Sequence, residues 1–300
     1  MYIFLCQNIS SQYSFVGVSY DAIFTTVFTI IVFSLGLLFN KIRETNKEKK
    51  KLNELEVYYL DLVSSLIDPV DKQSKNLRSL ADSIKDKKAR NFELTESSEI
   101  FFDVFDQIPH QDIYKILVLN KKSASDERYT HYKNILNSIE FLKLRRELSR
   151  FNFTKFMDDL RRYESDWNTN ANLIIRSFDK YVSFNKSQGI EPSQDPFLKE
   201  FDILIHNARQ LDDFQNMYVC KEYLLNPLKK YCQDNFDDPR AFELIQFIVS
   251  ANYAFNDLVN LKEFYSEAFM SESEKLKDFK NKLEQAVEFF GNAILVSPPP

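Results

Sequence analysis

The sequence of 300 residues is poor in glycine, proline, cysteine and histidine, with 4, 9, 3 and 3 of them respectively. Only glycine readily adopts the positive φ angles that tight turns and phosphate-binding loops need, so this composition disfavours sheet-rich folds. The glycine-rich nucleotide-binding motifs, the zinc-protease and serine-hydrolase motifs and the EF-hand loop are all absent from the sequence. We therefore expect no cofactor.

Cysteine spacing and net charge exclude two further classes of site. Cys220 and Cys232 are far from Cys6, and no CxxC or paired Cys/His spacing exists, so the sequence predicts neither a metal site nor a redox pair. The net charge of −5 gives no global electrostatic reason to bind nucleic acid, and we expect no such partner. The 28 phenylalanines and 15 tyrosines are expected to fill a helical core.

One segment near the N-terminus carries no charge. Residues 22–40 are uncharged, and the apolar run 23–39 is close to the length that spans a bilayer as a helix. We predict a transmembrane helix at residues 21–40, with a buried core helix as the alternative. The side chains expected to contact lipid include Ile23, Phe28, Ile31, Phe33, Leu37 and Phe39.

Basic residues follow this segment and are absent before it, since residues 1–20 contain no lysine or arginine. The juxtamembrane basic residues are Lys41, Arg43, Lys47, Lys49, Lys50 and Lys51. By the positive-inside rule the C-terminal part is cytoplasmic and residues 1–20 form a short extracytoplasmic N-terminus. A basic n-region and a small-residue cleavage site are both missing, so the segment is expected to remain as a single-pass anchor in the cell membrane. The lipid bilayer is thus one expected partner, and the basic cluster either sets the orientation alone or also contacts anionic lipid.

Apolar residues continue past the basic cluster at the spacing of a coiled coil. We predict that residues 41–68 form a stalk helix, which Pro69 ends. Its apolar seam consists of Leu52, Leu55, Tyr59, Leu62 and Leu66. The seam suits pairing with a second copy, which would make a homo-oligomer, and it equally suits docking onto the chain's own helices.

The rest of the chain has helical periodicity and no sustained strand alternation. The predicted fold is all-α: a single N-terminal transmembrane helix continuing into a stalk helix, then an α-helical cytoplasmic bundle. Its predicted parts are residues 69–188, a loop at 189–196, residues 197–296 and a proline-rich tail at 297–300. A helix break is expected at residues 167–170, and a helix start at Asp238 and Pro239, because an N-cap aspartate followed by proline is typical of one.

The best-arranged polar cluster in the sequence has helical spacing. Asp202, His206, Arg209 and Asp213 are expected to share one face of a helix, opposite an apolar stripe. The cluster resembles an ion-paired, solvated face more than an active site, because one exposed helix cannot close a first shell around a metal. Asp202, His206 and Asp213 are therefore only weak catalytic candidates.

These observations favour a non-enzymatic, membrane-anchored interaction or scaffold protein with a protein partner of unknown identity. The first alternative is a membrane-located effector or transducer of a bacterial stress or phage-defence system. In its broad layout the chain looks like such proteins, abortive-infection types included. The second alternative is an enzyme without a recognisable motif, acting through Asp202 and His206.

Overall fold

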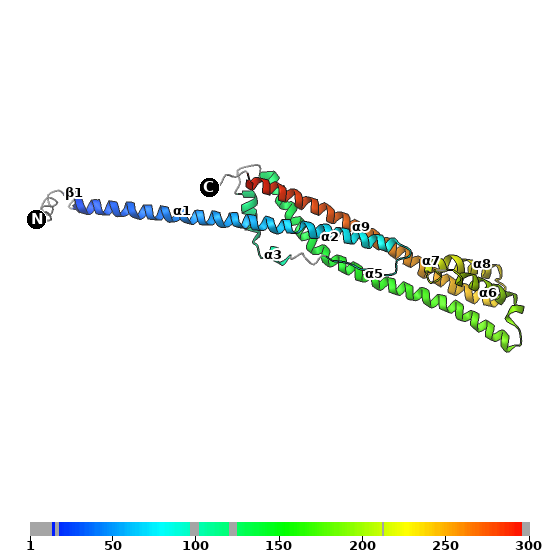
Figure 1. Cartoon of the computed structure of the whole chain (residues 1–300). Helices are drawn as coiled ribbons and strands as arrows, with labels where there is room; N and C mark the ends of the chain where they lie inside the picture. Colours follow the sequence, from blue (N-terminus) through cyan, green and yellow to red (C-terminus); the bar gives the residue numbers. More distant parts are fainter. Residues whose placement is uncertain (1–13, 16–17, 97–101, 120–124, 212, 296–300) are drawn as a thin grey trace. The chain divides into compact units, whose positions relative to one another are not determined.

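The computed structural model describes residues 14–15, 18–96, 102–119, 125–211 and 213–295, and it is all-α (Figure 1). Two strands of two residues each, β1 (Ser14–Phe15) and β2 (Val18–Ser19), pair antiparallel with Ser14 opposite Ser19. Every other regular element in these ranges is helical. The chain divides into two compact units: unit 1 comprises Met1–Leu62 and Asp106–Tyr132, and unit 2 comprises Val63–Phe105 and Lys133–Pro300.

Unit 1 contains most of the long helix α1 (Tyr20–Ser65), the short α4 (His110–Tyr114), the π-helical turn η1 (Lys115–Leu119) and the start of α5 (Ser125–Ser187). Arg128 on α5 is buried, and its Nε donates a hydrogen bond of 2.7 Å to the carbonyl of Leu117. Burial lowers the pKa of Arg128, while the charge of the buried Glu56 on α1 opposes that effect. The charged pair joins α5 to α1, and the edge-to-face rings of Tyr114 and Tyr132 join α4 to α5.

Unit 2 is built on α9 (Pro239–Leu295), along which α2 (Ile67–Lys85) and α5 pack. Small residues let α2 approach closely: the Ser74 and Ser273 hydroxyls each donate to the other residue's carbonyl, at 2.9 and 2.7 Å. Ser266 likewise donates to the Ala81 carbonyl at 2.9 Å. Partner numbers on α9 fall as those on α2 rise, so the two helices are antiparallel.

Aromatic pairs join α5 to the same helix. Phe141 stacks on Phe279 with ring centroids 4.1 Å apart. Farther along, Phe156 packs against Tyr265, and then Trp167 against Phe255. This order makes α5 antiparallel to α9 as well. The expectation that phenylalanine and tyrosine fill the helical core is confirmed for Phe156, Tyr265 and Phe255, which are buried, whereas Phe141 and Phe279 are half-buried.

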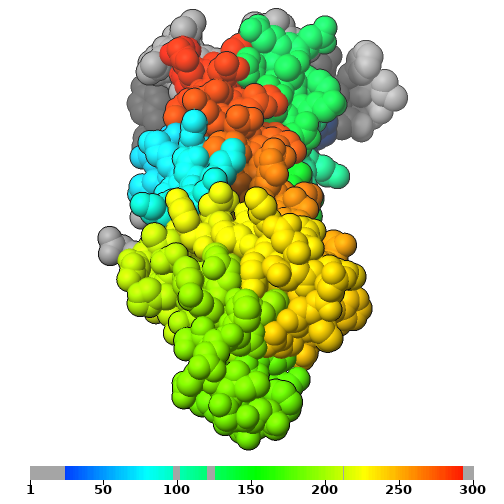
Figure 2. Space-filling model, turned by 90° about the vertical axis from the view of Figure 1, so that its right-hand side faces the viewer, coloured from blue at the N-terminus to red at the C-terminus, as the bar shows by residue number. Residues whose placement is uncertain are grey.

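One end of unit 2 is completed by short helices. They are η2 (Pro192–Gln194), α6 (Pro196–Arg209), α7 (Met217–Cys220), the π-helical turn η3 (Lys221–Leu225) and α8 (Asn226–Asp234). Their buried side chains share one apolar core with the start of α9. In Figure 2 the yellow-green to yellow residues of α6, α7 and α8 form a continuous part of the face shown. The helix α3 (Asp103–Asp106) precedes α4.

The predicted end of the stalk differs from the structure. Helix α1 ends at Ser65 and α2 begins two residues later at Ile67, so Pro69 does not stop the chain from being helical. Pro69 is the third residue of α2. Proline is tolerated there because the first backbone N–H groups of a helix have no partner inside the helix.

The predicted break at residues 167–170 is wrong, because α5 runs through it without interruption. Trp167 is buried against Phe255, while Asn168 is exposed and Asn170 is half-buried. Burying such a side chain stabilises by roughly 2–3 kcal/mol, whereas each asparagine costs about 0.6 kcal/mol of helix propensity. The tertiary contact therefore outweighs the local preference.

The predicted helix start at Asp238 and Pro239 is confirmed. Asp238 Oδ1 accepts a hydrogen bond of 2.9 Å from the backbone N–H of Arg240, and Pro239 is the first residue of α9. The predicted loop 189–196 contains Gly189 at φ 73°, followed by η2. This loop lies inside unit 2 and does not separate the two compact units. The predicted tail, residues 297–300, lies outside the described residues.

Candidate functional site

The predicted anchor forms the first part of α1. Among the described residues, this is the one helical region long and apolar enough to cross a membrane, and none of its apolar window is buried. Its large apolar side chains are between 47% exposed at Leu35 and 74% exposed at Phe24. By length and composition alone a core helix would pass the same test, so this exposure favours the predicted anchor without showing it. Ile23 lies in α1, but the structure does not describe its side chain.

The basic cluster and the stalk seam differ in how far they are covered. All six basic residues from Lys41 to Lys51 are exposed. In the seam, Leu52, Leu55 and Leu62 are half-buried, whereas Tyr59 is buried in unit 1 and Leu66 in unit 2. Burial and the nearby Tyr132 raise the pKa of Tyr59. At Tyr59, then, the chain's own helices cover the seam, which agrees there with the alternative of docking onto the chain's own helices.

The weak catalytic candidates are not brought together. Asp202 and His206 are exposed on α6, where the His206 ring lies 2.9 Å from the Gln210 amide nitrogen. Asp213 does not share their helical face, because α6 ends at Arg209. The final turn tightens as the Leu211 N–H bonds to the Ala208 carbonyl, and the chain then turns toward α7.

The described residues offer no metal-binding cluster. No group of three or more His, Cys, Asp or Glu among them is placed to hold an ion. Cys220 and Cys232 are free and buried, and burial raises their pKa values to about 11 and about 12. Both thiols are therefore protonated near neutral pH and poorly nucleophilic. Cys6 lies outside the described residues.

A polar cleft in unit 2 contains two titratable side chains, Lys262 and Glu164, whose pKa values are shifted by burial. Its cavity of about 210 Å³ lies between the segment after α2, α5, the turn before α7, and α9. Lys262 of α9 is only 7% exposed, and its Nζ donates to the Asp86 carbonyl at 3.1 Å. The same ammonium group lies 5.2 Å from the centre of the Phe92 ring. The cleft therefore contains a buried cation that touches an aromatic face.

Burial shifts both members of this pair toward their neutral forms. It lowers the pKa of Lys262 and raises that of Glu164, while the attraction between the two charges opposes each shift. Lys87 and Arg90 also line the cleft, and Lys87 Nζ lies 5.5 Å from the centre of the Tyr218 ring. Perturbed titratable groups in a cleft are typical of functional sites.

A second, larger cavity adjoins the cleft. It has a volume of about 520 Å³, and Arg90, Asn168 and Gln215 line both cavities. Arg209 is its other cationic lining residue. Its apolar lining consists of Trp167, Ala171, Ile174, Ile175, Phe214, Cys220, Leu224 and Leu225. The two cavities together provide a cationic part next to an apolar part.

Sequence reasoning missed this cleft because its residues come from distant positions. One local signal was present: Lys262 follows Leu258 by four residues and precedes Tyr265 by three, so a lysine occupies the buried stripe of α9. A lysine on a core stripe needs a partner or a ligand.

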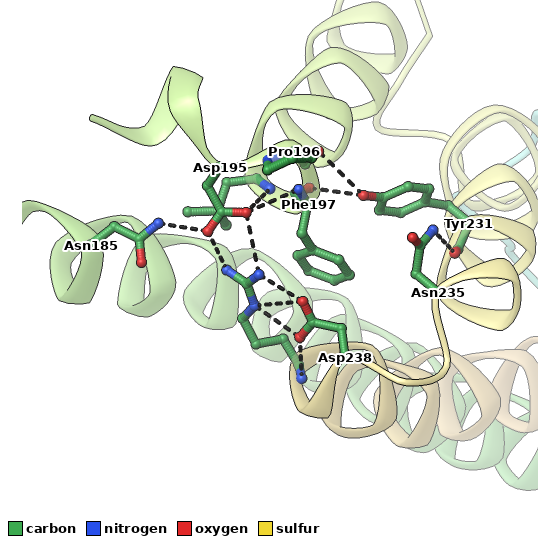
Figure 3. Close-up of polar contacts among 9 residues, drawn as sticks. Asn185, Asp195, Pro196, Phe197, Tyr231, Asn235 and Asp238 are labelled. Atoms are coloured by element: carbon green, nitrogen blue, oxygen red, sulfur yellow. Dashed lines mark hydrogen bonds and ion pairs between the residues drawn. The ribbon is translucent and has the colours of Figure 1, made fainter. Parts of the chain in front are cut away.

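A separate polar cluster joins the starts of α6 and α9 to the end of α5 (Figure 3). Arg240 donates to both Asp195 oxygens, at 2.6 and 3.2 Å, and through Nε and Nη2 to Asp238, with the shortest contact 2.7 Å. Asp195 also caps α6 by accepting from the backbone N–H of Phe197, and it accepts from Asn185 Nδ2 at 2.6 Å. Each carboxylate thus caps a helix and binds the same guanidinium, which makes the cluster a structural crosslink.

This cluster predicts a loss of stability in acid. Arg240 and the other donors lower the pKa of Asp195 to about 2, below the ordinary value of 3.8. The stabilisation, on the order of 2 kcal/mol, is therefore complete above about pH 4 and is lost as the pH falls toward 2. We expect the melting temperature, followed by circular dichroism, to drop over this interval. In the Asp195→Asn variant, which keeps the cap acceptor, the drop should be smaller, and an equal drop would contradict the assignment.

Comparison with known proteins identifies no family. No model of a protein family matches the chain, and no curated protein or solved structure is significantly similar to it. What the structure itself defines is an all-α chain with one helix long and apolar enough to cross a membrane.

Proposed function

We propose that this protein is a single-pass membrane protein that presents a helical bundle as an interaction module at the cytoplasmic face. The observation that carries the proposal is the exposed apolar start of α1, where Phe28, Phe33 and Phe39 are each more than half exposed. Exposing so many large apolar side chains to water along one helix is costly, and a bilayer removes that cost.

The orientation rests on charge. The six exposed basic residues of α1 follow the apolar segment, and the first twenty residues have no lysine or arginine. Retaining lysine and arginine on the cytoplasmic side is the general rule for single spans. This supports a cytoplasmic location for unit 2 and an outside location for Cys6.

The interaction role is supported by the exposed aromatic side chains of α9. Phe242, Tyr253 and Phe264 are spaced by eleven residues, which brings them close to one face of the helix, and each is more than half exposed. Aromatic residues contribute strongly to protein interfaces. The anchor would confine this module to two dimensions and raise its effective concentration for a protein partner.

Labelling of single cysteines tests the orientation. In intact cells, a maleimide that does not cross bilayers should label the wild-type chain at Cys6, and Cys6→Ser should abolish this signal. Cys220 and Cys232 should remain unlabelled even after permeabilisation, because both are buried with raised pKa values. In the Cys6→Ser background, Lys88→Cys, at an exposed position of unit 2, should react only after permeabilisation. Labelling of that variant in intact cells would overturn the orientation.

Crosslinking in native membranes tests the partner. Capture of one other protein by the full chain, reduced in a variant with Phe242, Tyr253 and Phe264 changed to serine, is expected for an interaction module. A ladder of the chain's own oligomers would instead support the alternative of a self-assembling membrane effector and direct attention to Leu52, Leu55 and Leu62. These three seam residues are only half-buried and so retain area for a second copy.

A further inference from the structure

We propose that the two adjoining cavities of unit 2 form a binding site for a small organic anion. The negative group of the ligand, a phosphate or a carboxylate, contacts Lys87, Arg90 and Lys262, and its apolar body enters the cavity lined by Trp167. This site goes beyond the interaction role and does not depend on the membrane anchor.

The charge balance of the cleft selects an anion. Lys87, Arg90 and Lys262 line it together with one carboxylate, that of Glu164. The described lining residues therefore carry an excess of positive charge when all are ionised. A cleft lined by charges of one sign raises the local concentration of ligands with the opposite charge.

The cationic side chains of the cleft have N–H donors beyond those in their hydrogen bonds and ion pairs to the chain. An ammonium group has three N–H donors, and Lys262 directs one of them at the Asp86 carbonyl. Arg90 forms an ion pair with Asp213 at 3.7 Å, and both side chains are about half exposed, so this contact is weak. A guanidinium presents a planar pair of N–H donors that matches phosphate and carboxylate oxygens.

The second cavity indicates that the ligand is more than a bare ion. Its volume of about 520 Å³ lies in the range of small-molecule sites, and its apolar lining from α5, the turn before α7, and η3 suits an apolar or planar group. Because Arg90, Asn168 and Gln215 line both cavities, one molecule can extend from the cationic part into the apolar part.

The chain contains a built-in reporter, because Trp167 is its only tryptophan and lines the apolar cavity. The full chain in lipid nanodiscs should be titrated at low ionic strength with phenyl phosphate, benzoate and adenosine 5′-monophosphate. We expect a saturable change in Trp167 emission with at least one of these anions. Phenol and adenosine lack the anionic group, and inorganic phosphate lacks the apolar group. Each of these three compounds should bind at least tenfold more weakly.

Three variants locate the anion. Lys87→Gln combined with Arg90→Gln alters exposed side chains and should weaken binding at least tenfold without changing the melting temperature. Lys262→Met, which removes the charge and keeps most of the length of the buried side chain, should also weaken binding. Lys88→Gln is the matched control, since Lys88 is exposed between the other two positions and lines neither cavity, and its affinity should equal that of the wild type. Phosphate and carboxylate ligands are distinguished by whether phenyl phosphate or benzoate binds more tightly.

Two results would overturn the proposal. One is the absence of any saturable Trp167 response to all three anions. The other is equal affinity in the wild type and in the Lys87→Gln, Arg90→Gln variant, which would mean that the response arises elsewhere.

Discussion

Changing both Ile31 and Phe33 to lysine is expected to release the full chain from membranes into the soluble or aggregated fraction. The two side chains lie near the middle of the apolar segment and are 50% and 66% exposed. A lysine at the centre of a membrane-spanning helix costs roughly 3 kcal/mol, and each change also removes a favourable apolar contribution of about 0.5 kcal/mol. The total, about 7 kcal/mol, exceeds what a single span can lose and still insert efficiently.

Alkaline carbonate extraction of membranes measures this effect. The wild type should stay in the membrane pellet, whereas the double variant should be extracted. Ile42→Lys is the matched control, because Ile42 is equally apolar and 55% exposed but lies beyond the predicted span, beside Lys41 and Arg43. The prediction fails if the double variant resists extraction as the wild type does, and α1 would then have to be an exposed helix of another kind.

Arg240→Met is expected to destabilise unit 2 more than any exposed ion-pair substitution. The arginine side chain is 25% exposed and is the shared partner of Asp195 and Asp238, which are themselves mostly covered. Its guanidinium also lies 4.6 Å from the centre of the Phe197 ring. Removing it leaves two carboxylates close together without a counter-charge, and we expect a loss of about 2–3 kcal/mol in the free energy of unfolding.

Thermal unfolding of the full chain, followed by circular dichroism at neutral pH, measures this loss. Arg161→Met is the control, since Arg161 pairs with Asp158 at 3.8 Å on the surface with both side chains mainly exposed, and such pairs contribute less than about 1 kcal/mol. Adding Asp195→Asn and Asp238→Asn to Arg240→Met should restore part of the stability. Asparagine removes the repulsion and still caps a helix. If the triple variant were less stable than Arg240→Met alone, repulsion between the carboxylates would not be the cause.

Local patterns were enough to predict much of this fold. Helical periodicity and the scarcity of glycine indicated an all-α chain, and the pair Asp238 and Pro239 marked the start of α9, because capping depends on neighbouring residues only.

Local patterns failed where a distant contact outweighed them. Polar residues at 168–170 predicted a break in α5, but the packing of Trp167 against Phe255 keeps the helix intact. The spacing of Asp202, His206 and Asp213 predicted one helical face, but α6 ends before Asp213. In the first case a distant contact kept a helix intact, and in the second the helix ended at Arg209, before the last residue of the predicted polar face.

The sequence by itself determined that the chain is helical and that one uncharged, apolar segment precedes a basic one, since composition, periodicity and charge order are properties of neighbouring residues. Only the tertiary structure brought Arg240 to Asp195 and placed Lys262, Arg90 and Glu164 around one cleft. Residues this far apart in sequence meet because α2 and α5 each pack antiparallel along α9, and no local spacing encodes that arrangement.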